Sequence, residues 1–97
     1  ERNKNLEFRV QLMSTKQPIP GFRLFGIILD SIPDTEVFVD QEDGMFKYQI
    51  GTRHTLEDAV ELKNKIVDLG YTDSFINAYY NRKKISIEEA KKVLNQN

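Results

Sequence analysis

The segments Phe8–Leu12 and Phe46–Ile50 share one pattern, which reads aromatic, basic, apolar, Gln, aliphatic. Primary amides both donate and accept hydrogen bonds, so they suit ligands that carry hydroxyl and acetamide groups. Side chains alternate between the two faces of a strand, and we therefore expect the polar members of both segments to share one face. Those polar members are Arg9, Gln11, Lys47 and Gln49.

The segment Asp73–Tyr80 adds aromatic rings to that face. Its predicted buried side chains are Ile76, Ala78 and Tyr80, which leaves Phe75, Asn77 and Tyr79 pointing outward. Flat rings offer apolar contact area at a low cost in entropy, so amides, cations and rings together form a candidate binding surface. The alternative is that the polar side chains are simply solvated, as on the outer face of most antiparallel sheets.

Side chains that could perform catalysis are few and poorly arranged. His54 is the only histidine and there is no cysteine, so neither a metal site nor a thiol nucleophile is expected. The acidic pairs Glu57–Asp58 and Glu88–Glu89 stand near predicted helix starts, where carboxylates complement the helix dipole. We therefore predict a non-enzyme with no cofactor, no metal and no catalytic residue.

Length and composition predict one small domain over residues 1–97, with its core in about residues 6–94. The 97 residues are 39% hydrophobic and 30% charged, which is typical of a folded domain. The net charge of −1 argues against general nucleic-acid binding, and no apolar run has the roughly 20 residues that would span a bilayer. We expect a monomeric module that belongs to a longer protein, with any targeting segment lying outside this sequence.

Periodicity and capping signals predict the order β-α-β-β-α-β followed by a short helix. Thr55 and Ser86 are predicted to cap the two later helices, and Gly70 to end the first of these. The Asp-Gly pair at residues 43–44 is typical of a tight hairpin, and a turn is predicted over residues 81–84. The strands are predicted at 6–13, 36–41, 45–51 and 73–80, with helices over about 22–32, 56–69 and 86–94.

This order predicts an α+β fold of the ferredoxin-like, split βαβ type. It is a four-stranded antiparallel sheet, with right-handed crossovers placing both main helices on one face. The repeated pattern of Phe8–Leu12 and Phe46–Ile50 indicates that these two strands are the central, adjacent pair. The opposite face of the sheet is then left open, since only the short terminal helix remains that could cover it.

The same segments resemble a SPOR domain, a sporulation-related peptidoglycan-binding module. The family pattern "VQ-aliphatic" is similar to Val10–Leu12, and its pattern "Y-x-aliphatic-Gly" is similar to Tyr48–Gly51. The start of the family's helix is similar to Thr55–Ala59, and the end of that helix to Leu69–Tyr71. The continuation over Asp73–Ala90 is similar to a variant common in envelope proteins of Bacteroidetes. The resemblance covers the chain from about residue 8 to residue 94.

The resemblance implies a ferredoxin-like module of the periplasm or cell envelope that binds peptidoglycan glycan strands stripped of their stem peptides. Such a module holds an attached protein at the cell wall or division site. Gln11 and Gln49 would then hydrogen-bond sugar substituents, and Phe75 and Tyr79 would stack on pyranose rings. The candidate glycan-binding residues are Arg9, Gln11, Lys47, Gln49, Phe75, Asn77 and Tyr79.

Two other binding functions fit a fold of this type. An open sheet face or an exposed edge strand can dock a protein partner, here another envelope protein. Four-stranded sheets also bind RNA through aromatic side chains. RNA binding is disfavoured because Arg, Lys and Gln occupy the central strands, and we expect the basic residues 82–84 to form a solvated turn.

Overall fold

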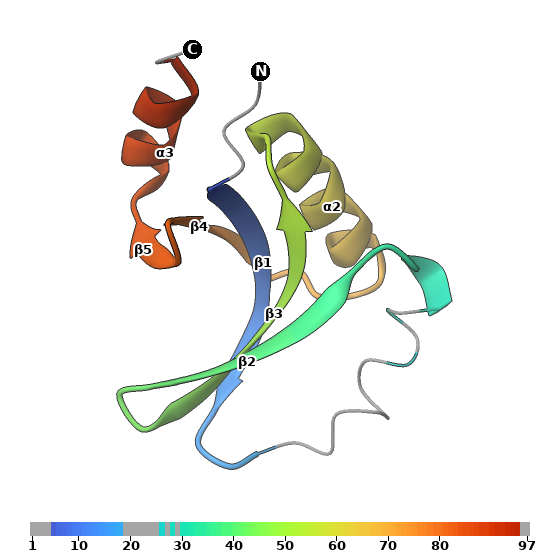
Figure 1. Ribbon diagram of the computed structural model, residues 1–97. Coiled ribbons are helices and arrows are strands. Elements are labelled where there is room, and N and C mark those ends of the chain that lie inside the picture. Colours follow the sequence, from blue (N-terminus) through green and yellow to red (C-terminus); the bar gives the residue numbers. More distant parts are fainter. Residues whose placement is uncertain (1–4, 19–25, 27, 29, 96–97) are drawn as a thin grey trace.

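A computed structural model describes residues 5–18, 26, 28 and 30–95 of the chain (Figure 1). The described elements are five strands and two helices, all of which lie in one continuous fold. They are β1 (Leu6–Thr15), β2 (Glu36–Glu42), β3 (Met45–Arg53), α2 (Leu56–Asp68), β4 (Phe75–Tyr80), β5 (Lys83–Ile85) and α3 (Ile87–Asn95).

The strands form one antiparallel sheet in the order β2-β3-β1-β4-β5, which confirms the predicted α+β class. The repeated segments lie on β1 and β3, which are neighbours as predicted, and Gln11 stands opposite Gln49 in their register. The expected number of four strands was wrong. Only Asn81 and Arg82 form the turn after β4, and Lys83–Ile85 then returns along β4 as a fifth strand.

The helix predicted over about residues 22–32 lies largely outside the described residues. Within that segment the structure describes Gly26, Ile28, Asp30 and Ser31 in helical conformation. The Ile32 N–H donates to the Ile28 carbonyl at 2.8 Å, and both side chains join the core.

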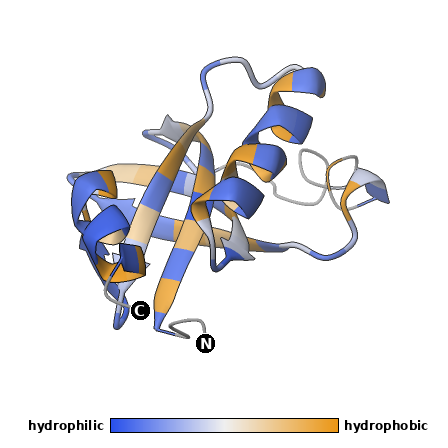
Figure 2. Cartoon of the chain, turned by 90° about the horizontal axis from the view of Figure 1, so that it is seen from above, coloured by the Kyte–Doolittle hydropathy of each residue, from blue (hydrophilic) through white to orange (hydrophobic). Residues whose placement is uncertain are grey.

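The core lies between the sheet and the helices. Phe8 of β1, Ala59 of α2 and Ala90 of α3 belong to one buried cluster, so α2 and α3 cover the same face of the sheet. A second cluster joins Val10, Ile50 and other strand residues to Leu62 and Ile66 of α2. Figure 2 shows the alternation of polar and apolar residues along the strands that produces this one-sided burial.

Local signals fix the ends of the elements as the sequence predicted. The Thr55 hydroxyl accepts a hydrogen bond from the Asp58 N–H at 3.2 Å, and α2 ends before Gly70, whose φ is 109°. Ser86 and Glu89 form a reciprocal capping box at the start of α3. Asp43 and Gly44 both have positive φ, as a two-residue hairpin turn requires.

Strand β1 departs from strict alternation after Gln11. Its register against β3 shifts between Gln11 and Met13, so one extra residue is accommodated there. Leu12 is buried, and Met13 also packs against the same core cluster. The sequence predicted Leu12 inside, but the bulge brings both apolar side chains to the core.

No helix in the described part of the chain has the length and apolar character needed to cross a bilayer.

We expect Arg82→Gly to raise the free energy of unfolding by roughly 1 kcal/mol, because Arg82 has a φ of 69° that a side chain disfavours. Glycine adopts this conformation without strain, and the preceding Asn81 already suits the turn. Urea denaturation of the two proteins tests this, with Arg82→Ala as the variant that keeps a Cβ. Equal stability of the glycine and alanine variants would contradict the prediction.

Candidate functional site

The candidate site is the sheet face opposite α2 and α3, which we call the concave face. In a flat sheet, β2 and β5 would lie four strand spacings of about 4.8 Å apart. Here Val39 and Asp40 of β2 line the same hollow as Lys84 of β5. The sheet is therefore curled, and side chains on this face converge.

Three amide side chains from three neighbouring strands form a hydrogen-bonded row on the concave face. Asn77 Nδ2 on β4 donates to Gln11 Oε1 at 2.9 Å and lies 3.4 Å from Gln49 Oε1. The Tyr79 hydroxyl also donates to Gln49 Oε1, at 3.0 Å, and Gln49 Nε2 donates to Asp40 Oδ2 at 2.8 Å. Gln49 is thus the centre of the network and is only 1% exposed.

Arg9 lies between two aromatic rings at the centre of the face. Its Cζ is 3.9 Å from the centroid of Phe38 on β2 and 4.5 Å from that of Tyr79 on β4. Its Nη2 donates to Glu7 Oε2 at 3.3 Å, whereas its buried Nε has no hydrogen-bond partner among the described residues. Cation–π attraction therefore holds the guanidinium in a fixed position.

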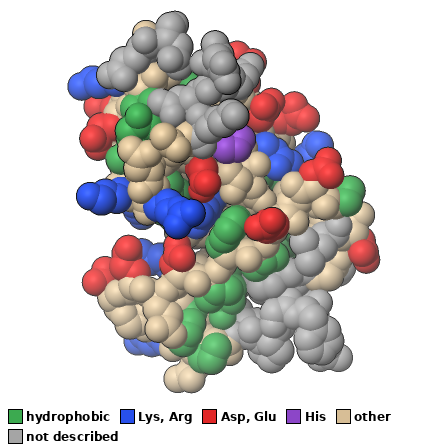
Figure 3. Space-filling view, in the orientation of Figure 1, with side chains coloured by type: hydrophobic (Ala, Val, Ile, Leu, Met, Phe, Trp, Pro, Cys, Tyr) green, Lys and Arg blue, Asp and Glu red, His purple; other side chains and the backbone are tan. Residues whose placement is uncertain are grey.

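A hollow of about 270 Å³ opens on the concave face between β5 and the β2–β3 hairpin. Figure 3 shows basic and acidic side chains close together over this part of the surface. Gln11, Gln49 and Tyr79 contribute to its wall, so the amide row borders the hollow directly. The other lining residues are Val39, Asp40, Gln41, Glu42, Lys47 and Lys84.

Charges around the hollow are balanced. Lys47 Nζ forms a salt bridge with Glu42 Oε1, and this hydrogen bond is the main reason that the pKa of Glu42 is lowered. The positive charge of Lys84 lowers that pKa further. Burial raises the pKa of Tyr79, so its hydroxyl keeps its proton and remains a donor to Gln49.

The structure brings the seven predicted site residues together on one face. The alternative that the polar side chains are simply solvated is wrong for Gln11 and Gln49, which are buried, as are Asn77 and Tyr79. Convergence of the curled strands and mutual hydrogen bonding explain that burial. Phe75 alone presents an exposed ring, with 46% of its surface accessible, and it lies opposite Gln11 in the β1–β4 register.

Sequence reasoning missed Phe38, Asp40 and Lys84. Phe38 and Asp40 could have been predicted from the sequence. A hairpin closed at Asp43–Gly44 places Phe38 opposite Gln49 and Asp40 opposite Lys47. The sequence predicts Lys84 in a turn, and nothing in it indicates that Lys84 lies on a strand opposite Tyr79.

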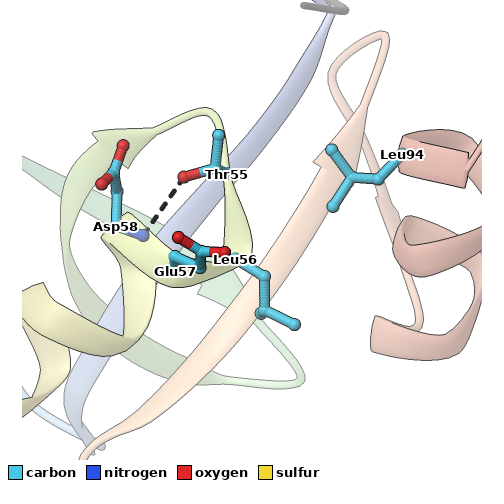
Figure 4. A pocket seen from close by; sticks show the side chains of 5 residues that line it. All are labelled: Thr55, Leu56, Glu57, Asp58 and Leu94. Atoms are coloured by element: carbon cyan, nitrogen blue, oxygen red, sulfur yellow. Dashed lines mark hydrogen bonds between the residues drawn. The ribbon is translucent and has the colours of Figure 1, made fainter. Parts of the chain in front are cut away.

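Two of the side chains considered for catalysis, those of His54 and Glu89, have structural partners, and the Glu89 carboxylate accepts from Ser86. His54 Nδ1 donates to the Leu6 carbonyl at 2.8 Å. A separate hollow of about 260 Å³ lies at the start of α2 (Figure 4). The Thr55 hydroxyl caps the helix there, and the side chains of Leu56 and Leu94 form the apolar part of its wall. Among the described residues, no three potential metal ligands of the His, Cys, Asp and Glu types form a group.

Comparison with known proteins finds no family model that matches the chain, and no match among curated proteins or solved structures.

Proposed function

We propose that this chain is a non-catalytic module that binds peptidoglycan glycan strands on its concave face, as SPOR domains do. In this proposal the sheet and helices form a ferredoxin-like arrangement to which β5 is added. The pairing order β2-β3-β1-β4 supports it, because a split βαβ fold has this order. The module would hold an attached protein at the cell wall, in the periplasm or cell envelope.

The observation that carries the proposal is the exposed Phe75 ring beside the amide row. Phe75 and Gln11 are cross-strand neighbours, and Gln11 lines the hollow. The Gln11 Oε1 atom is held by Asn77, while its Nε2 group has no hydrogen-bond partner among the described residues. A sugar unit can therefore stack on the ring and accept a hydrogen bond from the adjacent amide.

The burial of the amide row supports ligand binding, because its side chains are already ordered before a ligand arrives. Each amide is already held by its neighbours, so little side-chain entropy is lost when a ligand arrives. The hollow of about 270 Å³ is slightly smaller than typical ligand pockets of about 300 to 1,000 Å³, which suits one sugar unit at a time. A linear glycan would present further units along the face.

The first test is co-sedimentation of the domain with purified sacculi, before and after an amidase removes the stem peptides. We expect the domain to pellet with sacculi, and the pelleted fraction to rise after amidase treatment. Phe75→Ala should reduce apparent affinity about tenfold, because one stacking contact is lost.

Val60→Ala is the matched control, since Val60 is also an exposed apolar residue but lies on α2. It should pellet like the unmodified domain. Absence of pelleting in both sacculus samples would overturn the proposal. Steep salt-dependent binding to single-stranded RNA in place of sacculi would favour an RNA-binding function.

A second candidate is docking of an envelope protein, and the edge strand β2 favours it. This strand ends the sheet, spans seven residues and carries Val39, which is 52% exposed. An extended peptide can add to such an edge through main-chain hydrogen bonds. Unlike glycan binding, this function predicts no effect of Phe75→Ala, and it predicts loss of partner binding when Val39 is replaced by proline.

A further inference from the structure

The turn that joins β4 to β5 holds an arginine in an unfavourable backbone conformation. Asn81 and Arg82 have φ values of 52° and 69°, and the Asn81 N–H donates to the Asn5 carbonyl at 3.1 Å. Glycine is the residue that best suits the second position of such a turn. The long cationic side chain that stands there in place of glycine points to a use for the side chain itself.

Arg82 lines a second hollow, of about 400 Å³, together with Asn5, Glu7 and Asn81. This hollow continues the concave face. Glu7 stands opposite Tyr79 in the sheet register, and its carboxylate accepts the hydrogen bond from Arg9. Gln11, Arg9 and Glu7 alternate along β1, so neighbouring side chains of this series are about 7 Å apart.

Arg82 brings a positive charge to this end of the face. Its side chain is exposed and forms no ion pair with a described residue. The carboxylate of Glu7, which also lines the hollow, is already engaged by Arg9. A ligand that carries an anion would therefore be favoured here over a neutral one.

We propose that this second hollow is a subsite for a carboxylate-bearing sugar unit of the same glycan, with the Arg82 guanidinium donating to the carboxylate. The planar guanidinium can offer two parallel N–H groups to the two carboxylate oxygens. The inference rests on the proposed function, and it adds that the ligand is an anionic glycan spanning both hollows. Phe75 and Gln11 bind one sugar unit, and Arg82 binds the carboxylate of another.

The test compares two forms of one glycan preparation, namely amidase-treated strands with free carboxylates and the same strands with those carboxylates capped as neutral methylamides. We expect the unmodified domain to bind the free form about tenfold more tightly. Arg82→Gly and Arg82→Asn should bind both forms equally, since both residues tolerate the turn but lack the cation. Isothermal titration calorimetry gives the affinities.

Lys91→Gln is the matched control, because it removes one exposed cation from α3 on the other face of the sheet. It should keep the full preference for the free form. Equal binding of both forms by the unmodified domain, or a preference that survives in both Arg82 variants, would overturn the inference while leaving the proposed function intact. Failure of both forms to bind the unmodified domain would instead overturn the proposed function, and the inference with it.

Discussion

Replacing Gln49 with leucine is expected to lower the free energy of unfolding by about 2 to 3 kcal/mol. Leucine keeps most of the volume but removes the acceptor used by Asn77 and Tyr79 and the donor used by Asp40. Asn77 and Tyr79 are buried, so the loss of their partner leaves polar groups unsatisfied away from water. A domain of this size would then melt about 10 to 20 °C lower.

Gln41→Leu is the control for this change, because Gln41 belongs to the same hairpin but is exposed and outside the amide network. Its effect on stability should remain within about 0.5 kcal/mol. Thermal unfolding followed by circular dichroism measures both variants. Similar melting temperatures for the two would show that the amide row contributes no more than a surface contact does.

The elements that the sequence predicted well are those with several local signals in agreement. Helix α2 has an apolar stripe, the Thr55 cap and the glycine at residue 70, and its observed range follows these signals. The β2–β3 hairpin was indicated by alternation on both strands and by a dipeptide that tolerates positive φ. The shared pattern of β1 and β3 identified neighbouring strands and also the residues that face away from the helices.

The features that the sequence did not predict depend on contacts between distant segments. Strand β5 has only three residues, too few for a periodic pattern, and its turn contains Arg82 where a glycine would have signalled a hairpin. The bulge at Leu12 arises from the register in which β1 pairs with β3, a strand distant in the sequence. Curling of the sheet, which buries the amide row, is a property of the whole sheet, and alternation within one strand carries no information about it.

Burial of the amide row changes how the site residues should be interpreted. Gln49 and Asn77 hold their neighbours in place, whereas Gln11 lines the hollow and Phe75 presents an exposed ring. Mutation of Gln49 is therefore a poor test of ligand binding, because lost binding would follow from lost structure. Variants at Phe75 and Arg82 separate the two effects, since neither side chain supports the core.

Phe8→Ala is expected to have the largest effect on stability, a loss of about 3 to 5 kcal/mol. Phe8 is fully buried in the cluster that contains Ala59 of α2 and Ala90 of α3, so truncation opens a cavity where both helices meet the sheet. Because the total stability of such a domain is about 5 to 15 kcal/mol, this loss is a large part of it. Urea denaturation measures the change.

Phe75→Ala removes the same side chain from the opposite face and is the matched comparison. Its ring is half exposed, so we expect a stability change of about 0.5 kcal/mol, together with the tenfold loss of glycan affinity. The two phenylalanines thus separate the two faces of the sheet, one stabilising the fold and the other proposed to contact the glycan. A destabilisation by Phe75→Ala as large as that by Phe8→Ala would contradict this division, because it would mean that the Phe75 ring is part of the packing.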